Sequence, residues 1–224
     1  MGEAMNEPTQ ALRIEPRWPL ALAVIAVLFL HALLPGRIRV FPIWVPYVLG
    51  IALIGPMAAI TLTDAKVKWL RIERVITMSF FVVVGAATVA NLEHLIAAMM
   101  RRSGEIGGNQ LLTSSIAIWV VNVVMFSLVY WHIDRGGPEA RANNASRRPD
   151  WLFPQEGARE YVPSDWRPTF VDYLFLGFST ATAFSPTDVL PLTSRAKILM
   201  MLESAISLVT IVVVASRAIN IVGS

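Results

Sequence analysis

One carboxylate inside a long apolar run, Glu203, has the strongest claim to chemistry in this sequence. It opens a series spaced by four, three, four and three residues: Glu203, Ser207, Thr210, Val214 and Arg217. In a helix this spacing puts all five side chains on one face. A carboxylate inside a membrane span is costly unless it meets water or a partner, so this polar stripe needs an explanation.

Two interpretations of the stripe stay open. In the functional one, Glu203 lines a path for ions or protons. In the structural one, it holds a neighbouring short helix through Ser179, Thr180 or Thr182. Small polar residues commonly join membrane helices, and this favours the structural interpretation.

A second polar group lies in the apolar run Val75–Met100, where Asn91, Glu93 and His94 fall close together. Histidine titrates near neutral pH, so a proton relay is one interpretation. Adjacent residues of a helix point about 100° apart, so Glu93 and His94 do not face one partner squarely. We favour a polar cluster close to the membrane surface. In the next run, Asn122 is expected to bond across to another helix.

Several kinds of chemistry are not expected. His31, His94 and His132 are the three histidines, no local spacing pairs them as metal or haem ligands, and the chain has no cysteine. The sequence has no nucleophile elbow, phosphate-binding glycine loop or paired carboxylates at hydrolase spacing, so we expect neither an enzyme nor a cofactor. The formal net charge of +3 is spread over loops, which argues against nucleic acid as a partner.

Five apolar runs must carry these residues. Hydrophobic residues make up 55% of the chain, which is high for a soluble domain. A bilayer core about 30 Å thick needs roughly 20 apolar residues of helix, and a lone strand in lipid would leave its backbone groups unpaired. We therefore predict five spans in a plasma membrane of bacterial type, in contact with membrane lipids: Trp18–Pro35, Ile43–Thr63, Val75–Met100, Leu111–Ile133 and Ala196–Val222.

A shorter apolar segment, Thr169–Thr182, follows the long polar stretch 134–168. It is too short to cross a bilayer and suits a half-helix that enters the membrane and turns back. Pro168 fits the first turn of this helix, and Ser185-Pro186 ends it because proline disfavours helix in the preceding residue. Two Asp-Trp pairs predict docking of the polar stretch at the membrane surface: Asp150-Trp151 and Asp165-Trp166.

From Gln110 onward the order is helix, long loop, half-helix, irregular turn and helix. Three features resemble the pore helix, the end of the filter and the inner helix of tetrameric potassium channels: "DYLFLGFSTATAF", the residues Asp188 and Pro191, and "LTSRAKILMMLESAISL". The resemblance implies a homo-oligomer, a tetramer if it is a pore, with monovalent ions as partners. It divides the chain into a three-helix region, 1–109, and a pore-module-like region, 110–224.

The chain is also similar to a family of bacterial integral membrane proteins. The similar segments read "YWHIDRGGPEARA", "WLFPQ", "ATAFSPTD" and "PLTSRAK" here. This similarity implies a fold and no reaction. Together with the apolar runs, it predicts an all-α membrane protein with five transmembrane helices and one re-entrant, pore-like half-helix.

The filter is where the sequence departs from the potassium channels. Where that family reads Thr-Val-Gly-Tyr-Gly-Asp, this chain reads Ala183-Phe184-Ser185-Pro186-Thr187-Asp188. Glycine freely adopts the backbone angles that turn successive carbonyls toward one axis, whereas serine and threonine do not. Pro186 also removes a backbone donor that would brace the filter. We therefore expect no potassium-type filter.

Two functions remain open on these grounds. One is a channel-like pore of another selectivity, formed by several copies and lined by Thr180, Thr182, Ser185, Thr187 and Glu203. The other is a non-conducting membrane component that binds a lipid, a small apolar ligand or a partner protein. A symmetric tetramer with 185–188 at its axis would favour the pore.

Two arguments about orientation disagree. Basic residues near span ends mark the cytoplasmic side. The N-terminal tail and the link between the second and third runs hold Arg13, Arg17, Lys66, Lys68, Arg71 and Arg74, against Arg37, Arg39, Arg101 and Arg102 on the other side. This count favours a cytoplasmic N-terminus and a half-helix loop that faces the cytoplasm. The potassium-channel resemblance implies the opposite orientation of that loop.

Overall fold

The structure is a computed structural model. It describes residues 18–34, 36, 39, 42, 44–45, 47–48, 50–53, 66–100, 108–142, 148–182 and 188–222. Most of the second expected span, 43–63, lies outside the described residues, and so do the filter-equivalent residues Ala183, Phe184, Ser185, Pro186 and Thr187.

Three helices are long and apolar enough to cross a membrane. They are α3 (Lys66–Met100), α4 (Gly108–Ile133) and α8 (Ser194–Val222). A fourth helix, α1 (Trp18–Leu33), is apolar but has 16 residues, which is below the usual length of a span. The described chain is thus mostly helical with three candidate spans, all among the five apolar runs predicted from the sequence.

Helix α3 begins earlier than its apolar run. We expected a helix from Val75, and the structure starts it at Lys66. Lysine and arginine are good helix formers, so a basic segment ends the apolar run without ending the helix. The candidate span within α3 starts at Arg71.

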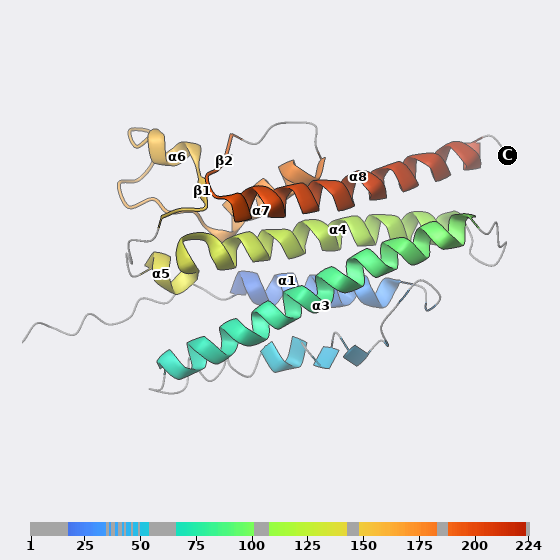
Figure 1. Cartoon of the computed structure of the whole chain (residues 1–224), viewed down its shortest axis with the longest axis horizontal. Helices are drawn as coiled ribbons and strands as arrows, with labels where there is room; N and C mark the ends of the chain where they lie inside the picture. Colours follow the sequence, from blue (N-terminus) through green and yellow to red (C-terminus); the bar gives the residue numbers. More distant parts are fainter. Residues whose placement is uncertain are drawn as a thin grey trace, which may run out of the picture.

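Helix α4 is the centre of the bundle. The helices α1, α3, α7 and α8 all pack on it, and Figure 1 shows α4 between α8 on one side and α1 and α3 on the other. It runs opposite to α1, α3 and α8, and most of its side chains are buried. A helix that is apolar on nearly all sides is stable when neighbours surround it.

The short helix α7 (Phe170–Thr182) has the bounds expected from the sequence, 169–182, to within one residue. At its start the backbone N–H and the hydroxyl of Thr169 both donate to Oδ2 of Asp172, over 2.7 and 2.8 Å; the bond from the backbone N–H is one half of a capping box. From there α7 runs back along α4. Tyr173 contacts Asp134 just beyond the end of α4, and the Phe178 ring packs edge-on against Trp119, 5.9 Å between centroids.

The segment between α4 and α7 folds over the end of the bundle (Figure 1). It contains η1 (Asp134–Gly136), α5 (Pro138–Ala142), β1 (Trp151–Leu152) and α6 (Pro154–Gly157). The strand β2 (Leu190–Pro191), which follows α7, pairs antiparallel with β1: Trp151 lies opposite Pro191 and Leu152 opposite Leu190. The chain therefore returns after α7 to the end of the bundle from which α7 started.

The prediction of surface docking by Asp150-Trp151 is wrong. Both side chains are fully buried. The Trp151 ring packs 4.7 Å from that of Tyr130, and its Nε1 donates to Sδ of Met200 over 3.3 Å. Local sequence gave no sign that β1 would be covered by α4 and α8. Asp165 is exposed and Trp166 half-buried, so the second pair lies nearer the surface.

Candidate functional site

Glu203 lies where α8 crosses α4. Thr193 caps α8, since its Oγ1 accepts a hydrogen bond from the Ala196 N–H over 3.3 Å. About two and a half turns further on, Glu203 is fully buried. The Tyr130 hydroxyl on α4 donates to its Oε2 over 2.5 Å. The carboxyl group therefore faces the neighbouring helix of the same chain.

The rest of the polar stripe faces the same way. Nδ2 of Asn122 donates to the Glu203 backbone carbonyl over 3.2 Å and to Oγ of Ser207 over 2.9 Å. Ser207 and Thr210 are fully buried, and the Thr210 hydroxyl donates to the Ile206 carbonyl. The expected cross-helix role of Asn122 has a specific partner in α8. The side chain of Arg217 lies outside the described residues.

Helix α7 is the third helix at the Glu203 site, beside α8 and α4. The Ser204 hydroxyl donates to the Thr180 backbone carbonyl over 3.2 Å. A Cβ built on Gly177 would overlap with Oγ of Ser127 and lie 3.3 Å from Oε1 of Glu203. The absence of a side chain at Gly177 thus lets the backbone of α7 approach both α4 and the carboxyl group.

The sequence predicted that Ser179, Thr180 or Thr182 of α7 would hold this helix against Glu203. Thr180 takes part through its backbone carbonyl, while its buried hydroxyl has no hydrogen-bond partner in the described part of the chain. The Thr182 hydroxyl donates to the Ser179 carbonyl within α7, over 3.1 Å. None of these three side chains bonds to Glu203 among the described residues.

The surroundings of Glu203 contain little to stabilise a negative charge. Among the described residues it forms no ion pair, and its Oε1 has no hydrogen-bond partner. A hydrogen bond to a charged group contributes about 1.5–3 kcal/mol. The effective cost of burying an unpaired ion is several kcal/mol, so the single bond from Tyr130 does not offset it.

Two further buried carboxylates hold the end of the bundle together. Asp134 accepts the Asp150 backbone N–H at Oδ1 over 2.7 Å and the Tyr173 hydroxyl at Oδ2 over 2.6 Å. Asp150 accepts the Thr193 hydroxyl over 2.6 Å, and a bidentate pair from Arg195 over 2.6 and 2.5 Å. The two acids therefore tie the end of α4 to β1, α7 and the start of α8.

The side chain of Arg141 binds backbone carbonyls at the end of α4. It is buried, and its Nη1 donates to the backbone carbonyls of Trp131 over 2.6 Å and Asp134 over 3.1 Å. Its guanidinium lies 5.2 Å from the ring centroid of Tyr173. The last carbonyls of a helix lack partners within the helix, and a buried cation satisfies them here.

Tyr173 sits between these charges. Burial raises the pKa of its hydroxyl well above the ordinary value; the Arg141 charge opposes this shift, and the Asp134 charge and hydrogen bond add to it. The hydroxyl consequently stays protonated and serves as a fixed donor to Asp134.

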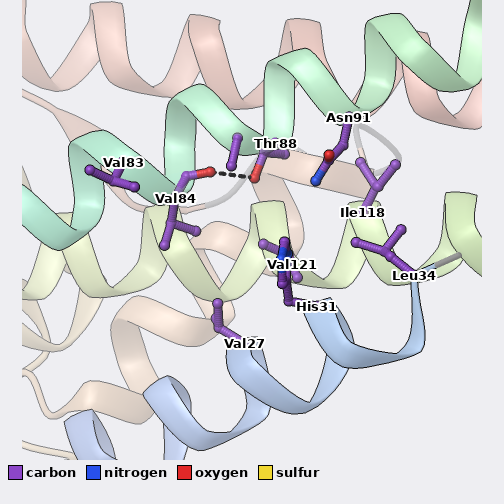
Figure 2. Close-up of a pocket in the computed structure, with 10 residues that line it drawn as sticks. Val27, His31, Leu34, Val83, Val84, Thr88, Asn91, Ile118 and Val121 are labelled. Carbon is purple, nitrogen blue, oxygen red and sulfur yellow. Dashed lines mark hydrogen bonds between the residues drawn. The ribbon is translucent and has the colours of Figure 1, made fainter. Parts of the chain in front are cut away.

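A separate cavity lies among α1, α3 and α4. Its space for the centres of water-sized molecules is about 30 Å³, more than one water needs. Figure 2 shows aliphatic side chains around it, with His31, Thr88 and Asn91 between them. His31 is buried, and its Nε2 has no hydrogen-bond partner in the described part of the chain. The aliphatic walls suit an apolar group such as the end of an acyl chain.

Other residues singled out in the sequence do not join the Glu203 site. Glu93 and His94 are both exposed on α3. Asp188 is exposed at the start of the segment that leads into β2. No group of three or more His, Asp or Glu side chains suited to a metal ion occurs within the described ranges.

The sequence gave no role to Tyr130, Asp134 or Tyr173, and Asp150 was expected at the membrane surface instead of inside the bundle. Tyr130 and Asp134 fall inside the quoted segment "YWHIDRGGPEARA", and this was their only signal. No family model, curated protein or solved structure matches the chain.

Proposed function

We propose that the chain is a multi-pass protein of a bacterial-type plasma membrane whose C-terminal half is a closed, non-conducting module, and that the protein binds lipid. One observation carries the proposal: the polar residues of the α8 stripe, Glu203 among them, face the chain's own helices. Glu203, Ser207 and Thr210 are fully buried, and two of them bond directly to α4. A polar stripe turned inward joins helices instead of lining a path for ions.

In this proposal α7 is the re-entrant half-helix. Its 13 residues make about 20 Å of helix at 1.5 Å per residue, which is short of a bilayer core of about 30 Å. Val171 and Phe175 of α7 are exposed, and Phe178 remains about half exposed beside Trp119. A segment that enters the membrane and turns back must be packed against other parts of the protein. Helix α7 packs against both α4 and α8.

The cavity beside His31 supports lipid as the ligand. In a bilayer, lipid acyl chains surround α1 and α3. The end of an acyl chain fits between the aliphatic walls of the cavity. Small-molecule sites are typically apolar with a few polar groups, and here those groups are His31, Thr88 and Asn91.

The proposed orientation puts the α5–α6 end of the bundle in the cytoplasm. The starts of α1, α3 and α8 lie at this end (Figure 1), and Arg74 of α3 donates to the Gly136 carbonyl there. Arg71, Arg74, Arg195 and Lys197 belong to the same end, so basic residues mark it as cytoplasmic. A periplasm-dependent reporter such as alkaline phosphatase, fused after Ser224, should be active. An inactive fusion combined with an active fluorescent one would reverse the orientation.

A pore formed by several copies is the second candidate. Exposed Asp188 directly follows the filter-equivalent residues, and large apolar side chains of α7 and α8 remain exposed, as an intersubunit surface requires. Native mass spectrometry of the full chain in nanodiscs separates the candidates. The proposal expects a monomer or dimer that retains lipid. A symmetric tetramer that passes ions would establish the pore instead.

A further inference from the structure

Glu203 differs from the other buried acids of the α4–α8 half. Asp150 pairs with Arg195, and Asp134 lies 3.6 Å from the Arg135 guanidinium and accepts two further hydrogen bonds. Glu203 is equally buried, and within the described ranges it accepts one side-chain hydrogen bond, from Tyr130. Asp150 and Asp134 thus each lie beside an arginine, whereas Glu203 has no such cation among the described residues.

Every element packed against Glu203 contributes neutral groups in the part of the chain that the structure describes. Helix α4 contributes the Tyr130 hydroxyl and the Asn122 amide, which bonds to the Glu203 backbone. Helix α7 contributes Gly177. On α8 itself the neighbours along the stripe are Ser207 and Thr210, both buried and uncharged.

We propose that Glu203 is a proton-binding site, a carboxylic acid that keeps its proton at neutral pH and needs it to seat α7 against α8. The inference rests on the proposed function, in which Glu203 joins helices. A carboxylate buried without a cation neutralises by binding a proton, because one hydrogen bond does not replace its hydration. A protonated carboxyl group can donate a hydrogen bond from one of its oxygens. Oγ of Ser127 and Oε1 of Glu203 both lie near the position that a Cβ on Gly177 would occupy.

Loss of the proton has a defined structural consequence. The ionised group would need water or a cation, and the contact that must open to admit either is that between α8 and Gly177 of α7. The neutral isostere Glu203→Gln keeps the shape without the charge. It should therefore preserve the seating of α7, whereas Glu203→Ala removes the group altogether.

Infrared spectroscopy of the full chain in liposomes at neutral pH tests the proton directly. The wild-type spectrum minus that of Glu203→Gln should contain the carbonyl band of a protonated carboxylic acid, shifted in D₂O. The matched control is Glu160→Gln, an exposed glutamate of the α6–α7 loop. Its difference spectrum should contain carboxylate bands. Carboxylate bands alone in the Glu203 difference would overturn the inference.

A second variant keeps the test decisive if Glu203→Gln does not fold. Tyr130→Phe removes the donor to Oε2 and should shift the protonated-carboxyl band, and an unshifted spectrum would contradict the assignment. The two claims fail separately. Ion flux through the wild-type protein would sink the non-conducting function whatever the infrared result. A carboxylate band without flux would sink the proton site alone.

Discussion

Gly177 of α7 faces Ser127 of α4 so closely that a Cβ at position 177 would overlap with the Ser127 hydroxyl oxygen. The Val123 carbonyl and Oε1 of Glu203 lie 3.2 and 3.3 Å from the same point. Backbone and a buried carboxyl group cannot move aside easily. Gly177 is therefore the position that sets how near α7 approaches α4.

Gly177→Ala should destabilise the protein by about 1–3 kcal/mol, as other overpacking substitutions do. The measurement is the free energy of unfolding in bicelles. The matched control is Gly157→Ala in α6, where nothing lies within 4 Å of the added Cβ and the effect should stay within about 0.5 kcal/mol. The double variant Gly177→Ala/Ser127→Ala should regain part of the loss. An unchanged stability for Gly177→Ala would contradict the close approach.

Arg195→Ala should cost about 1–3 kcal/mol of stability, because it leaves the fully buried Asp150 without its cation. The range is set below that of a fully buried pair since the Arg195 side chain is 59% exposed. Lys197→Ala, on the same turn and without a bridge to Asp150, is the control and should change stability by about 0.5 kcal/mol or less. Equal losses in both variants would show that general surface charge, and not the pair, matters.

Tyr173→Phe should lower stability at neutral pH by about 1–3 kcal/mol, because it removes a donor from the buried Asp134. Burial raises the pKa of the Tyr173 hydroxyl in the folded protein. Above the unfolded value of about 10, the unfolded state binds fewer protons than the folded one, so the wild type loses stability as pH rises. The stability gap between wild type and variant should then narrow above pH ~10. A constant gap would be inconsistent with a hydroxyl held neutral by burial.

Ala87→Leu should reduce the lipid that remains bound after detergent washing, because a larger side chain fills the cavity beside His31. Native mass spectrometry counts the retained lipid. Ala86→Leu, one residue earlier and exposed on α3, is the matched control and should leave the count unchanged. Retention of lipid by Ala87→Leu at the wild-type level would exclude this cavity as the site.

The sequence predicted those parts of the fold that depend on local pattern. The bounds of α7 were predicted to within one residue because its apolar length and the flanking Pro168 are local signals. The start of α8 was visible in the same way, since the helix begins at Ser194, two residues before the apolar run predicted as the fifth span. The basic start of α3 was missed because hydropathy marks where lipid begins and not where helix begins.

Local sequence patterns could not predict the contacts of the Glu203 site. Asn122 and Ser207 are 85 residues apart, and Tyr130 and Glu203 are 73 apart. No period in the chain links residues at these distances. Glu203 stood out because a charge in an apolar run is conspicuous by itself, whereas Tyr130, Asp134 and Tyr173 acquire their roles only when α4, α7 and α8 meet.

The most direct test of the non-conducting module is ion flux from proteoliposomes that contain the full chain. Monovalent-cation release should not exceed that of protein-free liposomes, and Glu203→Ala, which removes the bracket between α4 and α8, should not reduce it further. Release well above the protein-free level in the wild type, abolished by Glu203→Ala, would contradict the account and place Glu203 on an ion path.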